Sequence, residues 1–256
     1  MAKIIPDHWK ENSWEEKAQE NPLYAVMTMP DMKEADPEAF SEKHLDLFFA
    51  KGRRLAERWV LPSLENAPES GHVVEYGCGA GRILNALVER NIPCHGVDIS
   101  PTMLKHCALH VPKVESLICL DETGTIDLHD GCARLVYSYA VVQHIDKLSV
   151  YTRAIEEMCR LLKPSGMLAL QVNCEDYSYL QDGVLGRTEN FEDYSLHYNL
   201  VTNKCALHEN TTWSGVYVGL DYLKSCLERC GTVVEGIEPF NTAKPRAQFV
   251  FARKRS

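Results

Sequence analysis

The run Glu75-Tyr-Gly77-Cys-Gly79-Ala-Gly81-Arg82 combines residue types and spacing that suit the binding of a small ligand. It follows a short apolar stretch, His72–Tyr76, and leads into a helical pattern. A strand that ends in glycines and opens a helix lets the backbone approach a ligand closely and offers free amide donors. We therefore expect a ligand to lie over this turn.

The spacing of these glycines differs from that of a dinucleotide site. A dinucleotide fingerprint is G-x-G-x-x-G, which seats a pyrophosphate at the start of the helix. Here the third glycine comes one residue early, and Arg82 stands where that fingerprint has glycine. A ligand without phosphates but with an ammonium group suits the carboxylate of Glu75 at the strand end. A nicotinamide-dependent oxidoreductase is therefore the disfavoured alternative.

The elements that must position this turn follow from the hydrophobic pattern. Strands are expected at His72–Tyr76, Cys94–Asp98, Val114–Leu120, Leu135–Val141 and Met167–Val172. Helices are expected between them at Arg82–Asn91, from Ser100-Pro101 onward and at Ser149–Leu162. Strands that alternate with helices at this interval predict a doubly wound, mostly parallel sheet covered on both faces. Ligands of such sheets bind beyond the carboxyl ends of the strands.

The rest of the chain divides into flanking segments. Residues 1–70 are predicted to form an N-terminal helical arm that caps the ligand site, and residues 71–173 the core. Residues 174–215 interrupt the alternation and are expected to be an inserted lid that binds the acceptor. Residues 216–256 complete the sheet with a helix, Leu220–Cys230, and strands Thr232–Ile237 and Gln248–Ala252 that pair antiparallel, which brings the sheet to seven strands.

Composition excludes several classes of function. The formal charge is −9, and the two basic clusters, Lys51–Arg54 and Arg253–Arg255, are short. An acidic surface repels phosphate backbones, so we expect no nucleic-acid partner and interpret both clusters as solvated. The chain has no apolar run of membrane-spanning length, and the N-terminus lacks the apolar core of a signal peptide. The ten scattered cysteines suit a reduced, cytoplasmic protein that does not engage membranes.

Four pieces in order and register resemble the class I S-adenosylmethionine-dependent methyltransferases. They are Glu75–Gly81, Gly96-Val-Asp98-Ile-Ser-Pro-x-Met103-Leu, Val136–His144 and Leu161-Leu-Lys-Pro-Ser-Gly166. The resemblance covers residues 71–172 strongly and the C-terminal helix and strands more loosely. It implies a Rossmann-like methyltransferase fold and S-adenosyl-L-methionine as the cofactor. One departure is Arg134, where the family commonly has Asp in what is usually a structural position.

The resemblance also implies roles for individual residues at the cofactor. Main-chain groups of Gly77, Cys78 and Gly79 would hold its methionine part, with Glu75 near the amino group. Asp98 would accept both ribose hydroxyls. The residues expected around the adenine and the remaining cofactor surface are Ile99, Met103, Asp121 or Glu122, and Tyr139. Alternatives are that Glu75 satisfies a helix N-terminus, that Asp98 caps the next helix, and that Met103 only packs in the core.

Methyl transfer to a hydroxyl benefits from a general base, and His144 is the candidate. It follows the fourth strand, where the transferred methyl should lie, and Tyr24 of the N-terminal arm is its expected partner. The alternatives are that His144 caps a turn and that Tyr24 only packs. The expected chemistry requires no metal. Possible pocket residues in the lid, which could instead hold a divalent ion but are better explained by a solvated hairpin, are Asp176, His197, His208 and Glu209.

The sequence thus predicts an S-adenosylmethionine-dependent methyltransferase for a small-molecule acceptor, with a hydroxyl such as that of a sugar or secondary metabolite favoured. N-methylation of a small amine is one alternative. A noncatalytic cofactor-binding module on the same fold is another, although an eroded glycine turn or a lost Asp98 would be expected for it. The oligomeric state is open, with a homodimer among the possibilities.

Overall fold

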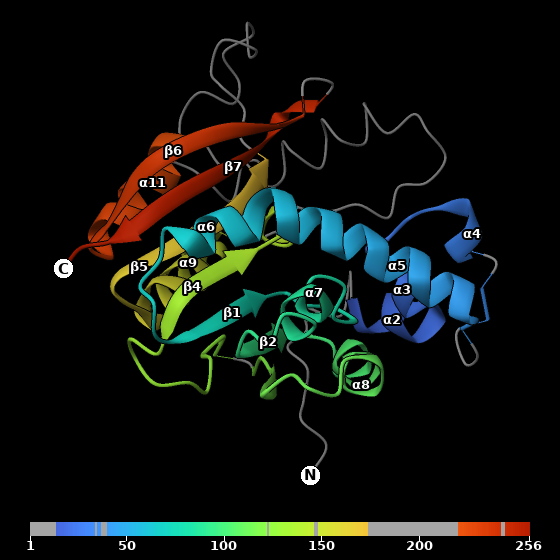
Figure 1. Cartoon of the computed structure of the whole chain (residues 1–256). Coiled ribbons are helices and arrows are strands. Elements are labelled where there is room, and N and C mark those ends of the chain that lie inside the picture. The colour runs from blue at the N-terminus through green and yellow to red at the C-terminus, as the bar shows by residue number, and fades with distance from the viewer. Residues whose placement is uncertain are drawn as a thin grey trace, which may run out of the picture.

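The computed structural model describes residues 14–33, 35–36, 40–121, 123–145, 148–173, 220–241 and 244–256. Its centre is a seven-stranded sheet in the order β3-β2-β1-β4-β5-β7-β6 (Figure 1). The strands are β1 (His72–Tyr76), β2 (Cys94–Asp98), β3 (Ser116–Cys119), β4 (Ala133–Ser138), β5 (Leu162–Asn173), β6 (Thr232–Asn241) and β7 (Lys244–Lys254). The first five are parallel, and β7 runs antiparallel between β5 and β6. The predicted α/β sheet with an antiparallel last strand is confirmed.

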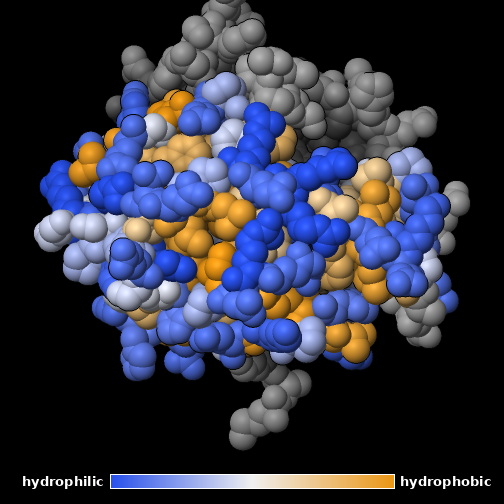
Figure 2. Space-filling model, in the orientation of Figure 1, coloured by the Kyte–Doolittle hydropathy of each residue, from blue (hydrophilic) through white to orange (hydrophobic). Residues whose placement is uncertain are grey.

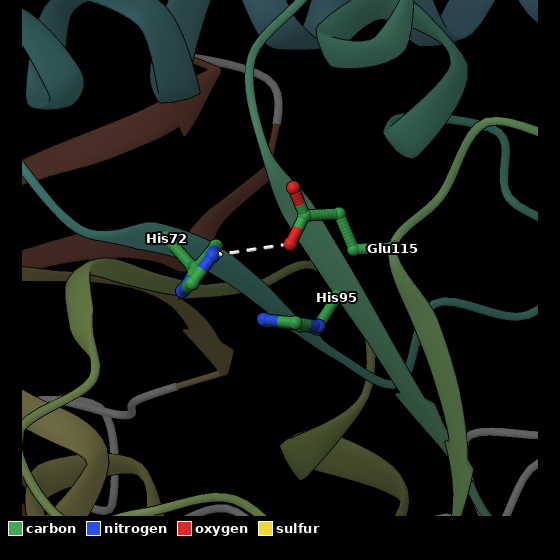
Figure 3. A group of neighbouring side chains, drawn as sticks. All are labelled: His72, His95 and Glu115. Carbon is green, nitrogen blue, oxygen red and sulfur yellow. Dashed lines mark ion pairs between the residues drawn. The ribbon is translucent and has the colours of Figure 1, made fainter.

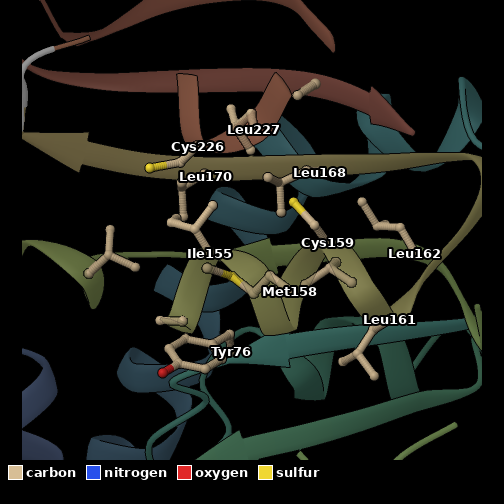
Figure 4. Packing of buried hydrophobic residues seen from close by; sticks show 14 of the residues in the cluster. Tyr76, Ile155, Met158, Cys159, Leu161, Leu162, Leu168, Leu170, Cys226 and Leu227 are labelled. Carbon is tan, nitrogen blue, oxygen red and sulfur yellow. The ribbon is translucent and has the colours of Figure 1, made fainter. Parts of the chain in front are cut away.

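Helices cover both faces of this sheet because successive strand residues point to opposite sides. Val74 packs with α9 (Leu148–Leu161) and α11 (Leu220–Arg229), in the cluster of Figure 4 that contains Ile155, Met158 and Leu227. The neighbouring Val73 packs on the other face. That face is covered by α5 (Glu42–Leu55), the π-helical turn η1 (Ala56–Val60), α6 (Leu61–Glu65), α7 (Leu84–Val88) and α8 (Pro101–His110).

In the part of the N-terminal arm that the structure describes, three short helices precede α5. They are α2 (Trp14–Glu20), α3 (Pro22–Val26) and α4 (Pro30–Lys33), and they lie at the end of the sheet toward which the β1 arrow points (Figure 1). The first two contact α8. In the same view the surface is mostly hydrophilic, with apolar side chains visible in the gaps (Figure 2). Within the described residues, no helix is both long and apolar enough to cross a membrane.

Several predicted boundaries need correction. The fourth strand ends at Ser138 rather than Val141, because Ala140 has a positive φ of 58° that breaks the extended backbone. The helix predicted from Arg82 begins at Leu84, after a turn through Gly81 at φ 81°. Strands β3 and β5–β7 also differ in length from their predicted ranges. The predicted second strand, Cys94–Asp98, agrees with β2.

The basic C-terminal cluster is not a solvated tail. Arg253 lies in β7, pairs with Glu235 at 2.5 Å and donates a hydrogen bond to the Asn66 carbonyl at 3.0 Å. Lys254 donates to the Cys230 carbonyl at 2.6 Å. These bonds tie the last strand to its neighbours, so the cluster is part of the fold.

The order of the strands determines where a ligand can bind. The chain leaves β1 toward β2 on one side and returns to β4 on the other, so the direction of winding reverses between β1 and β4. In open α/β sheets the crevice beyond the carboxyl ends of the strands at such a reversal is the binding position. The glycine turn and the end of β4 meet there.

Candidate functional site

The glycine turn after β1 requires glycine for two different reasons. A Cβ on Gly77 would collide with the side chain of Val141, and its φ is +77°. Gly79 has a φ of +52° and more room, since its nearest neighbour would be Val26 Cγ1 at 3.0 Å. Side chains disfavour this left-handed region of backbone conformation. The turn is therefore narrow at Gly77 and open toward the N-terminal arm at Gly79.

Four amides of this turn are already bonded within the protein, which corrects the expectation that they are free donors. Gly77 and Cys78 both donate to the Val97 carbonyl, at 2.7 and 3.0 Å. Gly79 donates to Asp98 Oδ2 at 2.7 Å. Gly81 donates to the Cys78 carbonyl at 3.0 Å. A phosphate needs several unpaired amides at such a turn, so this arrangement disfavours a pyrophosphate and suits a ligand that donates hydrogen bonds or carries positive charge.

Asp98 ends β2 and faces the turn across the crevice. Its second oxygen, Oδ1, accepts the Ser100 amide at 2.9 Å. A carboxylate has about four acceptor positions, and the backbone amides of Gly79, Ser100 and Ile99 all bond to this one. Burial raises the pKa of Asp98 above its ordinary value, although its backbone hydrogen bonds oppose that shift. Ser100, not Asp98, caps α8, since its Oγ accepts the Met103 amide at 3.0 Å.

Glu75 lies beneath the turn and is bonded to the protein itself. It is 3% exposed, and its Oε2 accepts the Tyr137 hydroxyl at 2.8 Å. The backbone of Leu84, the first residue of α7, also bonds to it. Burial raises the pKa of Glu75 to about 8, against the opposing effects of Tyr137 and Arg82. The contact with Leu84 fits the alternative in which Glu75 satisfies a helix N-terminus, and its role toward a cofactor stays a prediction.

The raised pKa of Glu75 predicts how stability depends on pH. Between its ordinary value of 4.5 and about 8, the unfolded chain loses this proton while the native protein keeps it. The unfolded state is therefore favoured progressively as pH rises, by up to about 1.4 kcal/mol per pH unit from this group. Glu75→Gln removes this contribution, so we expect the variant to gain stability relative to the parent between pH 5 and pH 8. Urea unfolding at each pH measures the difference.

Glu157 provides a matched control for this measurement. It is also buried, at 1% exposed, and burial alone would raise its pKa. The Arg160 and Ile126 hydrogen bonds outweigh burial and lower the pKa, so its stabilisation is present above pH 4.5 and lost only below it. Glu157→Gln should then cost the same stability at pH 5 and pH 8. If Glu75→Gln behaves in that way too, Glu75 is ionised in the native state and its assignment here is wrong.

Arg82 and Tyr139 form one wall of the crevice. The Arg82 guanidinium lies 5.5 Å from the centre of the Tyr139 ring and 5.9 Å from that of Phe48. Tyr139 in turn stacks on Phe249 of β7 at 6.3 Å between ring centres. Tyr139 therefore lies where β4 ends, as its predicted cofactor contact requires, but that contact itself stays a prediction.

The residues predicted around the adenine lie on the far side of Asp98. Ile99 follows Asp98 and is half-buried. Met103 is 1% exposed and packs with Ala80 and Leu23, which fits the core-packing alternative. Asp121 is exposed and accepts both the amide and the hydroxyl of Thr123, at 2.9 and 2.7 Å, so it closes its own turn. Glu122 lies outside the described residues.

Glu15 of the N-terminal arm is hydrogen-bonded to the start of α8, next to Asp98. Its Oε2 accepts the Ser100 hydroxyl at 2.6 Å and the Thr102 amide at 3.1 Å, and its Oε1 accepts the Thr102 hydroxyl at 2.6 Å. A carboxylate at the N-terminus of α8 is also favoured by the helix dipole. Together with Val26 over Gly79, Glu15 holds the arm against the turn and α8.

The candidate base, His144, lies in the short helix η2 (Val142–His144) just beyond β4. It is half-buried, and its ring meets that of Trp14 edge-on at 5.0 Å between centres. Gln143 Nε2 lies 3.4 Å from His144 Nε2. Tyr24 packs in the cluster that contains Leu23. The structure thus brings Trp14 of the arm to His144, while the pairing of His144 with Tyr24 stays a prediction.

Sequence reasoning missed Glu15 and Trp14. Both lie in a polar N-terminal segment, and their partners are more than 80 residues away along the chain. Trp14 stands out as a large apolar residue in that polar segment, which was the available signal for docking. Nothing local marks Glu15 among the neighbouring acidic residues. The predicted lid residues Asp176, His197, His208 and Glu209 lie outside the described residues.

Comparison with known proteins bears on the core of the chain. Residues 74–170 match the family model described as a methyltransferase domain. An uncharacterized methyltransferase of Mycobacterium tuberculosis (strain H37Rv) is 30% identical over 118 residues, which cover 46% of this chain and 44% of that protein. The malonyl-[acyl-carrier protein] O-methyltransferase of Methylococcus capsulatus is 29% identical over 120 residues, covering 46% and 42%. A tRNA (carboxymethyluridine(34)-5-O)-methyltransferase of Arabidopsis thaliana is 28% identical over 115 residues, covering 44% and 26%.

These alignments span less than half the length of each of the three proteins. The structural similarity to a solved protein covers more of the chain than these sequence alignments do. The magnesium protoporphyrin IX methyltransferase of Synechocystis, solved with bound SAH, superposes with a TM-score of 0.57 over 97% of each chain at 13% identity. At that identity the likeness establishes a shared fold and no more.

Proposed function

We propose that the chain transfers a methyl group from S-adenosyl-L-methionine to a hydroxyl of a small molecule, because residues 74–170 match the model of a methyltransferase domain and the fold is shared with a solved methyltransferase. The observation that carries the proposal is the paired state of the glycine-turn amides opposite Asp98. A turn in which the Gly77, Cys78, Gly79 and Gly81 amides are already bonded disfavours pyrophosphate. A nucleoside with a positively charged tail, as in this cofactor, carries no phosphate and can donate hydrogen bonds to Asp98.

The cofactor assignments extend this proposal to individual residues. Its methionine part lies against the backbone of Gly77, Cys78 and Gly79, and Asp98 accepts the ribose hydroxyls. Ile99 and Tyr139 border the nucleoside. Glu75 supports the turn from below through Leu84, so its effect on the cofactor is largely indirect.

The chemistry is an in-line displacement. The acceptor oxygen forms a bond to the methyl carbon, the carbon–sulfur bond breaks, and its electron pair neutralises the sulfonium. The hydroxyl proton passes to His144. A candidate base at this position favours a hydroxyl acceptor over a neutral amine, because a neutral amine needs no base. Alignment of the two reactants supplies most of the rate. The chain's own groups suffice for this reaction, and none of its steps calls for a metal.

The N-terminal arm serves as the cover of the site in this proposal. Glu15 holds α2 on α8, Val26 lies over Gly79 and Trp14 lies against His144. A cover of this kind excludes water from the sulfonium and completes the site. Residues 174–215 are proposed to supply the acceptor contacts. A reducing compartment, the cytoplasm, suits the free cysteines of the described chain.

A panel of acceptors tests this function directly. The protein is incubated with methyl-labelled S-adenosylmethionine and, separately, sugars, phenols, small amines and a tRNA that carries carboxymethyluridine at position 34. We expect label in one class of small hydroxyl compound. Label in amines alone would contradict the hydroxyl assignment. Label in tRNA alone would favour the activity that the Arabidopsis relative's name states and would contradict the small-molecule assignment, which the acidic charge of −9 supports.

A further inference from the structure

Two histidines and a glutamate meet at the amino ends of three adjacent strands. His72 opens β1, His95 is the second residue of β2, and Glu115 immediately precedes β3. Val74 pairs with His95 in the β1–β2 register, so His72 and His95 point to the same face of the sheet. Figure 3 shows the three side chains converging. The parallel strands place this cluster at the edge opposite the glycine turn, away from the proposed active site.

The spacing of the three side chains is close to that of a metal site. His72 Nε2 lies 3.1 Å from Glu115 Oε2, and one ligand atom from each of the three residues lies within 4.8 Å of the others. A tetrahedral zinc ion with bonds of about 2.0–2.2 Å separates its ligand atoms by about 3.4 Å. The His72–Glu115 pair already has nearly this spacing. To reach this spacing from His95 as well, the His72 and Glu115 ligand atoms must move by about 1 Å. Both side chains are half-exposed and can make this shift.

His95 is held in an orientation suited to a metal ligand. It is 8% exposed, and its Nδ1 lies 2.7 Å from the Ser116 hydroxyl. A hydrogen bond at one ring nitrogen fixes the orientation of the ring and leaves the other nitrogen for the ion, an arrangement common in metal sites. Here Nε2 is the nitrogen that remains. The centres of the His72 and His95 rings lie 4.6 Å apart, so the two imidazoles are close enough to contact the same ion.

We propose that His72, His95 and Glu115 bind a divalent transition-metal ion, with zinc the best fit and water in the fourth position. Two imidazoles and one carboxylate suit zinc, copper or nickel, whereas magnesium and calcium prefer oxygen ligands alone. The ion joins the amino ends of β1, β2 and β3, so it stabilises the native sheet by an amount that rises with the logarithm of the free ion concentration above its Kd. This inference is independent of the proposed methyl transfer.

Titration of the full chain with zinc chloride tests the proposal. We expect His72→Gln and Glu115→Gln each to remove one zinc equivalent per chain and to abolish the zinc-dependent rise in melting temperature. Ser116→Ala, which frees the His95 ring, should weaken zinc binding about 10–100-fold. His129→Gln, at an exposed histidine outside the cluster, is the matched control and should leave both readouts unchanged. Cobalt(II) substitution should give the visible absorption of a tetrahedral site in the parent and in His129→Gln, but not in His72→Gln or Glu115→Gln.

Affinity for S-adenosylhomocysteine serves as the fold check, since the cluster lies at the opposite edge of the sheet. Both cluster variants should bind it as the parent does. If they bind it normally and also keep the full zinc equivalent and the melting-temperature rise, the proposal is wrong and His72 and Glu115 form only an ion pair. If the His129→Gln control loses as much zinc as the two cluster variants do, the proposal is also wrong, because zinc binding would then depend on surface histidines in general.

Discussion

Asp98→Ala should weaken the binding of S-adenosylhomocysteine about 10²–10⁴-fold. Two hydrogen bonds from the ribose hydroxyls to a carboxylate would be lost, each contributing about 1.5–3 kcal/mol. Calorimetric titration of the folded variant measures the change. The effect on affinity should exceed any effect on acceptor binding, because Asp98 lies at the nucleoside and not at the end of β4.

A second variant, Asp98→Asn, helps to separate the hydrogen bonds of Asp98 to the ribose from its hydrogen bonds to the glycine turn. Asp98 also accepts the Gly79 and Ser100 amides, so its removal disturbs the loop as well. A double-mutant cycle with a ligand that lacks the ribose hydroxyls resolves the two effects. In the parent this analogue should bind about as weakly as the full ligand binds to Asp98→Ala. Asp98→Asn and Asp98→Ala should both lose most of the preference for the hydroxyls. An undiminished preference in either variant would contradict the ribose assignment.

His144→Ala should lower the turnover number about 10²–10⁴-fold while affinity for S-adenosylhomocysteine stays nearly constant, because a general base acts on the acceptor and not on the cofactor. The alternative, in which His144 caps a turn, predicts a loss of stability of about 0.5–2 kcal/mol with most of the activity kept. Turnover with the acceptor found in the panel, measured beside urea unfolding, distinguishes the two.

His144→Gln sharpens the same comparison. Glutamine keeps hydrogen-bonding capacity near Gln143 and Trp14 but does not take up a proton at neutral pH. The base assignment predicts turnover as low as that of His144→Ala. A glutamine variant with near-parental turnover would show that the imidazole only orients its surroundings, and hydroxyl chemistry would then need another base. Trp14→Phe, which keeps a ring against position 144, should retain most of the turnover and serves as the control for packing.

Local signals predicted much of this fold correctly. The β2 range, the Ser100 cap and the antiparallel pairing of β6 with β7 all depend on neighbouring residues or on simple alternation. Errors arose where a distant contact decides the conformation. The end of β4 depends on Ala140, which has a positive φ. Its backbone amide donates a hydrogen bond to Gln171 Oε1 at 2.8 Å.

The same distinction holds for the site. The glycine turn was predicted from spacing and Asp98 from the family resemblance, and their roles toward a cofactor stay predictions. The hydrogen bonds of the turn amides depend on β2 lying beside β1. The contact of His144 with Trp14 could not be deduced, because it depends on the docking of the arm, to which the hydrogen bonds of Glu15 with Thr102 contribute. His72, His95 and Glu115 have no shared sequence motif at all, since the register of three strands brings them together.

The most direct test of the account is calorimetric titration with S-adenosylhomocysteine and, separately, NAD, in the parent, Gly79→Val and Gly131→Val. Both glycines have positive φ, +52° and +66°, but only Gly79 lies in the turn. We predict one S-adenosylhomocysteine per parent chain, no NAD binding, a loss of about 100-fold or more in Gly79→Val, where a β-branched side chain would fill the space of the ligand, and near-parental affinity in Gly131→Val. Binding of NAD instead, or parental S-adenosylhomocysteine affinity in Gly79→Val, would contradict the central claim that this turn holds the methyl donor.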